Sequence, residues 1–167
     1  MVLDADVDVI DLELDALNSG NGDYNGASVT LVRNGVANPD DVFSFNDGNG
    51  ISLVGGNVLQ QAGATIATFD TTTTSGQLVI TFTNANGRTP TSLNVDNILR
   101  QITYANSSDA PDTSVQIDWT FNDGNTGAQG SGGALLATGS TTVNITAVND
   151  APVFSNLDGN PTFTEGG

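Results

Sequence analysis

The residues of this chain best suited to chemistry are carboxylates crowded near its N-terminus. Six of them fall within the first fifteen residues: Asp4, Asp6, Asp8, Asp11, Glu13 and Asp15. The first three alternate with apolar residues, so an extended chain would carry three like charges on one side. The alternation slips at residues 9–10 and then resumes, which predicts a strand with a bulge or a break.

Carboxylate oxygens in this number favour calcium, which prefers hard oxygen ligands. Three like charges on one strand face are unfavourable without a counter-ion. The alternative is a solvated acidic edge strand that discourages aggregation. We expect calcium as the bound ion, because a solvated edge rarely needs six acids.

The overall charge excludes several classes of function. The 167 residues hold 19 acidic side chains against three arginines, and lysine, histidine and cysteine are absent. These absences exclude a cysteine nucleophile, a thiolate metal site, a Ser-His-Asp triad and a lysine Schiff base. A net charge of −16 argues against nucleic acid and anionic membranes as partners. No apolar run is long enough to cross a bilayer, so we expect no membrane insertion.

Enzymatic activity is not expected. Paired carboxylates can hydrolyse glycosides, but the acids gather at one end of the sequence, with no sign of a partner acid in an apolar pocket.

The elements that must position these acids are short strands separated by Gly, Asn and Asp turns. The pattern predicts strands over 27–33, 42–45, 51–54, 58–61, 64–69, 78–83, 114–121 and 141–148, with another beginning at Tyr104. One short helix is predicted over about 93–102, capped by Thr91 or Ser92. This succession indicates an all-β fold, a β-sandwich of the immunoglobulin or cadherin kind with one short helix.

The clearest alternation runs through 114–121, where Val115, Ile117, Trp119 and Phe121 share one face. This phase predicts that Trp119 lies in the core and does not form an exposed platform for a sugar.

An Asn-Asp-Gly-Asn sequence follows an aromatic strand twice, at 46–49 and 122–125. Calcium loops of the EF-hand type need acids at alternating positions and a later glutamate, which neither stretch has. We therefore interpret both as tight turns.

The stretch Asn149-Asp150-Ala151-Pro152 follows the last predicted strand and leads to a further predicted strand at 161–165. It resembles the linker between cadherin repeats. Further blocks resemble the cadherin-like tandem repeat of large bacterial, RTX-type surface adhesins: 3–6, 11–15, 102–109, 119–125 and 163–167. The resemblance divides the chain into a cadherin-like sandwich over 2–148 and, over 149–167, a linker with the first strand of the next repeat.

The resemblance implies a secreted protein on a bacterial cell surface, in which calcium stiffens a spacer by joining adjacent repeats head to tail. The metal-binding residues that it implies are Asp4, Asp6, Asp11, Glu13, Asn149, Asp150 and Glu165. The alternative is a carbohydrate- or ice-binding module of an adhesin, for which Thr71–Thr74 is the only threonine cluster.

Overall fold

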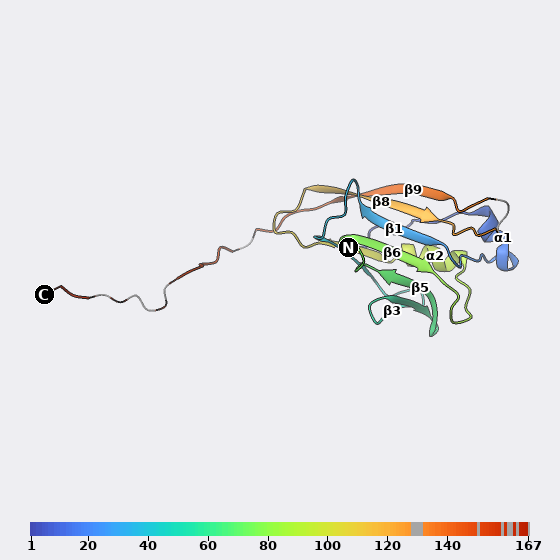
Figure 1. Ribbon diagram of the computed structural model, residues 1–167, viewed down its shortest axis with the longest axis horizontal. Coiled ribbons are helices and arrows are strands. Elements are labelled where there is room, and N and C mark those ends of the chain that lie inside the picture. The colour runs from blue at the N-terminus through green and yellow to red at the C-terminus, as the bar shows by residue number, and fades with distance from the viewer. Residues whose placement is uncertain (128–131, 150, 158, 160–161, 163, 167) are drawn as a thin grey trace.

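The computed structural model describes residues 1–127, 132–149, 151–157, 159, 162 and 164–166. These contain nine strands and two helices. Seven strands form an antiparallel sheet in the order β3-β4-β5-β6-β1-β8-β9, and β2 pairs with β7 in a second sheet (Figure 1). The all-β sandwich that the sequence predicts is confirmed, with two helices where the sequence predicted one.

The element bounds follow the chain in order. They are α1 (Leu12–Gly20), β1 (Ser28–Arg33), β2 (Asp41–Phe45), β3 (Ile51–Val54), β4 (Val58–Gln61), β5 (Ala64–Asp70), β6 (Gln77–Phe82), α2 (Ser92–Leu99), β7 (Ile102–Asn106), β8 (Ser114–Asn122) and β9 (Leu136–Asn144).

The core lies on the inner face of the large sheet. Along β8 every second side chain is buried, and Trp119 retains only 9% of its accessible surface. The predicted burial of Trp119 is therefore confirmed. Its indole Nε1 donates to Thr141 Oγ1 on β9 at 3.1 Å, so the one polar group of the ring has a hydrogen-bond partner.

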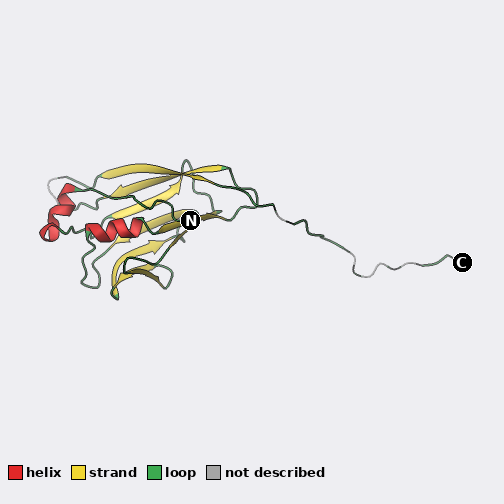
Figure 2. Cartoon of the chain, turned by 180° about the vertical axis from the view of Figure 1, so that it is seen from behind, coloured by secondary structure: helices red, strands yellow, loops and turns green. Residues whose placement is uncertain are grey.

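The second layer contains β2 and β7, and the N-terminal residues bond to β7. The two helices, red in Figure 2, lie beside the strands and outside both sheets. Leu3 N donates to Ile102 O at 2.9 Å, and Tyr104 N donates to Met1 O at the same distance. Residues 1–3 thus lie along β7 through one isolated antiparallel bridge between Val2 and Thr103. Thr91 is the N-cap of α2, and its hydroxyl accepts from Asn94 N in a reciprocal capping box; the helix buries Val95, Ile98 and Leu99.

The predicted strand over residues 4–15 is wrong. Asp4 Oδ1 accepts from Asp6 N at 3.2 Å and from Val7 N at 3.0 Å, which closes a turn. Asp11 is the N-cap of α1, because its Oδ1 accepts from Glu13 N at 3.1 Å and from Leu14 N at 2.9 Å. Aspartate carboxylates that bond nearby backbone N–H groups compete with strand pairing and favour turns and caps.

The last strand also differs from the prediction, since β9 spans 136–144 and the sequence predicted 141–148. Beyond it the chain leaves the sandwich at the end opposite α1 (Figure 1). The described residues after Asn149 carry no helix or strand. The strand predicted at 161–165 falls partly on residues 161 and 163, which lie outside the described residues. Within the described residues, no helix is long and apolar enough to span a membrane.

Candidate metal centre

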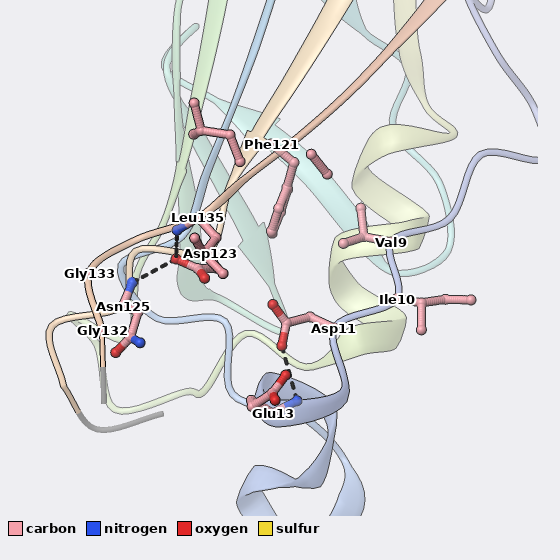
Figure 3. Close-up of a pocket in the computed structure, with 12 residues that line it drawn as sticks. Val9, Ile10, Asp11, Glu13, Phe121, Asp123, Asn125, Gly132, Gly133 and Leu135 are labelled. Atoms are coloured by element: carbon pink, nitrogen blue, oxygen red, sulfur yellow. Dashed lines mark hydrogen bonds between the residues drawn. The ribbon is translucent and has the colours of Figure 1, made fainter. Parts of the chain in front are cut away.

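Polar side chains from two segments line a cavity of about 400 Å³ at the α1 end of the sandwich (Figure 3). The N-terminal segment contributes Asp11 and Glu13 to its lining, and the loop after β8 contributes Asp123 and Asn125. Apolar side chains complete the wall, among them Phe121. Two segments more than a hundred residues apart in sequence therefore place polar groups around one hollow.

Asp123 is the most buried acid of this cavity, with 9% of its surface accessible. Its Oδ1 accepts from Asn125 N at 2.9 Å and from Leu135 N at 3.0 Å, and this ties the two ends of the loop together. Gly124 next to it has φ +67°, and a Cβ there would lie 2.3 Å from Gly26 O. Only glycine fits this position, so backbone packing fixes where Asp123 lies.

Asp11 and Glu13 differ in the hydrogen bonds that their carboxylates accept. Asp11 uses one carboxylate oxygen to cap α1, which leaves the other without a described partner. Glu13 is exposed in the first turn of α1 and its carboxylate accepts no hydrogen bond within the described chain. The helix N-terminus also favours negative charge at these two positions.

Negative charge extends from this end along the N-terminal segment. Asp96 on α2 accepts from Val9 N at 3.1 Å. Burial raises the pKa of the Asp96 carboxyl, the Val9 hydrogen bond and the positive charge of Arg100 oppose this shift, and the negative charges of Asp8 and Asp15 add to it. Arg100 also donates from Nε to Val7 O at 2.8 Å, so it offsets part of the negative charge beside the N-terminal segment.

Six of the seven metal-binding residues implied by the resemblance are described by the structure, and these six do not meet at one site. Asp11 and Glu13 share the cavity described above, whereas Asp4 and Asp6 lie on the turn before it. Asn149 lies instead beside Asp109 and Pro111 of the loop between β7 and β8, and Glu165 is exposed in the segment after β9, which carries no helix or strand in its described residues. Asp150 lies outside the described residues.

At the opposite end, the sequence analysis missed Asp109, whose carboxylate could also be a metal ligand. Asn149 lines a shallow surface recess together with Asp109 and Pro111 from the loop between β7 and β8. Asp123 and Asn125 were likewise missed as site residues at the α1 end. Their signal was the Asn-Asp-Gly-Asn sequence at 122–125, where Asn122 and Asp123 accept from the backbone N–H two residues on and where Asp123 and Asn125 line the cavity.

Neither end of the sandwich alone supplies enough oxygen atoms from its described residues to coordinate a metal ion. Considering only the residues that the structure describes, no three acidic side chains come close enough together to hold a metal ion. Asp11, Glu13 and Asp123 face a common cavity, but their carboxylates do not converge to coordination distance. A cation there would need further oxygens from water, from loop movement or from a neighbouring chain.

The threonine cluster at 71–74 has a local explanation. Asp70 accepts from the hydroxyls of Thr72 and Thr73 at 2.8 Å and 2.6 Å, and from the backbone N–H of both. These bonds hold the β5–β6 connection as a compact polar turn, and two of its hydroxyls are already engaged.

The chain matches no family model, no curated protein and no solved structure.

Proposed function

We propose that this chain is a structural spacer repeat of a bacterial cell-surface adhesin, stiffened by calcium bound where successive repeats meet head to tail. The observation that carries the proposal is the difference between the two ends of the sandwich. One end presents Asp11, Glu13 and Asp123 around a cavity, and the chain leaves the other end beside Asp109 and Asn149. In a head-to-tail row, these two oxygen-rich ends would face each other.

Ligand chemistry supports a shared site. Calcium takes six to eight oxygens at flexible geometry. The cavity end offers too few converging carboxylates for a closed site, so a neighbour's linker, with Asn149 and Asp150, and its Glu165 would complete the set. An ion bridging two domains would remove the freedom of the linker between them, which is the mechanical role of a spacer.

The charge of the chain supports the same proposal. A net charge of −16 destabilises a compact fold through self-repulsion. Two such ends approach each other only with cations between them. Extracellular calcium is millimolar in concentration, so sites of modest affinity would still fill.

The test joins two copies of the chain through residues 149–167 and compares thermal unfolding of this pair in EDTA and in millimolar calcium. Calcium that binds the folded state only should raise the Tm by mass action. Glu13→Gln in the second copy should reduce this increase and lower the Tm in EDTA only slightly, because its carboxylate accepts no hydrogen bond in the described chain and interacts only with the helix N-terminus.

The matched control is Asp118→Asn, which removes the same charge from the middle of β8, away from both ends. It should leave the response to calcium intact. Equal Tm values of the unmodified joined pair in EDTA and in calcium would contradict the proposal.

A further inference from the structure

β9 is an edge strand without the usual protection. It pairs with β8 over nine residues, Leu136–Asn144, and is the last strand of the seven-stranded sheet. Its sequence contains no charged residue and no proline, which are the features that normally block an edge. The edge at the other side of the sheet, β3, has only four residues. β9 therefore presents a long free row of backbone donors and acceptors.

The inner face of the sheet is open beside this edge. The register pairs Gly139 with Trp119 and Ala137 with Phe121, so these four residues lie on the same, inner face. Ala137 and Gly139 are nevertheless exposed. A Cβ built on Gly139 meets no atom within 4 Å. The second layer therefore ends before it reaches β9.

A groove of about 280 Å³ occupies the space left open. Leu99, Trp119 and Phe121 line it with apolar surface, and Gly139 lies on its β9 side. The N-terminal segment forms the facing side and contributes Asp4 and Asp8. Asp8 is exposed, and its carboxylate accepts no hydrogen bond within the described residues.

We propose that this groove and the edge of β9 bind an extended peptide segment that carries a lysine or arginine. The segment would add to the sheet beside β9, where main-chain hydrogen bonds supply affinity. Its basic side chain would lie over Gly139. The aliphatic stem would contact the apolar lining, and the cationic head would reach the carboxylates of Asp4 and Asp8.

Charge favours a basic peptide over two other segments that could cover the groove, which are the tail of this chain and a second copy of the chain. The tail over 149–167 holds three acids and no basic residue, so it would bring negative charge to Asp4 and Asp8. A second copy would bring a further net charge of −16. A basic segment is instead attracted by the whole molecule and by the groove itself. This proposal does not depend on the calcium sites.

The test uses the full chain and capped eight-residue peptides of alternating valine and threonine. One central position carries lysine, norleucine or glutamate. We expect saturable binding of the lysine peptide, weaker binding of the norleucine peptide and none of the glutamate peptide. Backbone NMR shifts should change along β9 and leave β3 unaffected.

Two variants locate the side-chain site. Asp8→Asn should weaken binding of the lysine peptide about two- to fivefold, the range for one exposed charge contact. Asp118→Asn removes the same charge from the outer face of the sheet and should change this affinity far less. Gly139→Leu fills the groove and should reduce binding of every peptide at least about tenfold, with folding checked by thermal melt.

Several results would overturn the proposal. They are equal affinity for the lysine and glutamate peptides, absence of binding, or shifts that map away from β9. β9 shifts that depend on protein concentration without peptide would assign the edge to a second copy. Outer β9 amides protected from exchange in the dilute chain would assign it to the tail.

Discussion

Acidic side chains in this protein divide between those that hold the fold together and those that accept no hydrogen bond within the described chain. Asp15 belongs to the first group, since its Oδ1 accepts from Tyr24 Oη at 2.7 Å and from Ser92 Oγ at 2.6 Å. Burial, together with the neighbouring Asp15 carboxylate, raises the pKa of the Tyr24 hydroxyl. Glu13 belongs to the second group. Sequence clustering alone treats both as equal candidates for a metal, and only the hydrogen bonds separate them.

Asp41 joins the two sheets and should be the most costly carboxylate to lose. Its fully buried side chain accepts from Arg33 on β1 at 2.7 Å and from Tyr104 on β7 at 2.6 Å. Asp41→Asn should lower the free energy of unfolding by about 3–5 kcal/mol, because it leaves the Arg33 charge poorly compensated. Asp112→Asn removes the exposed second partner of Arg33 and should cost at most about 1 kcal/mol. Urea unfolding of both variants measures the difference, and equal losses would contradict this role.

The same carboxylate predicts a pH dependence. Burial alone would raise the pKa of Asp41, but hydrogen bonds from Arg33, Tyr104 and Asn106 outweigh it and lower the pKa below its ordinary value. The stabilisation is therefore present above the ordinary aspartate pKa of about 3.9 and is lost as the pH falls further. The stability difference between wild type and Asp41→Asn should shrink below about pH 4. A difference that stays constant from pH 6 to pH 3 would be inconsistent with this titration.

Gly124 tests whether close backbone packing against Gly26 fixes the loop after β8, which lines the cavity. Gly124→Ala should destabilise the fold by about 1–3 kcal/mol, because a side chain would meet Gly26 at a positive φ. Gly139→Ala is the matched control, since a Cβ there meets open space. Denaturant unfolding compares the two. Equal stability would mean that the loop relaxes without cost.

At the scale of the elements, alternation predicted the strands well where one face is buried. The predicted bounds of β3 and β4 agree with the structure, and those of β8 differ by one residue. β9 was placed too late in the chain because its first residues, Leu-Ala-Thr-Gly-Ser, are all exposed and carry no period-two pattern. A strand whose two faces are both uncovered has no hydrophobic signature to detect.

The prediction for the N-terminal acids failed in the opposite way, because it placed a strand where none forms. Their period-two spacing imitates a strand, yet Asp4 closes a turn and Asp11 caps a helix. An N-cap aspartate followed by acids in the first turn was the local signal for α1. The cavity itself was not predictable, since it depends on long-range packing of the 122–125 turn against the N-terminal segment.

Trp119 anchors β8 against the second layer. Trp119→Ala should lower the free energy of unfolding by about 3–5 kcal/mol, the range for a large buried aromatic. The native chain should show blue-shifted emission from this single tryptophan, with little quenching by iodide. Emission already at the solvent-exposed wavelength in the native state would contradict burial.

At the scale of the whole molecule, the fold is a rod-like unit with different chemistry at its two ends. The α1 end carries the acidic cavity, and the chain exits at the far end beside Asp109 and Asn149 (Figure 1). A unit with unlike ends forms heterologous contacts, which propagate in a row and do not close as a dimer. This arrangement fits a tandem spacer, in which each repeat contacts the next in the same way.

The most direct test of the spacer proposal uses two copies of the chain joined through residues 149–167. Spin labels on the two sandwiches report the distribution of distances between them. We predict a broad distribution in EDTA and a single narrow one, at longer distance, in millimolar calcium. Glu13→Gln in the second copy should partly restore the broad distribution. Identical distributions of the unmodified pair with and without calcium would contradict the proposal that calcium stiffens the junction.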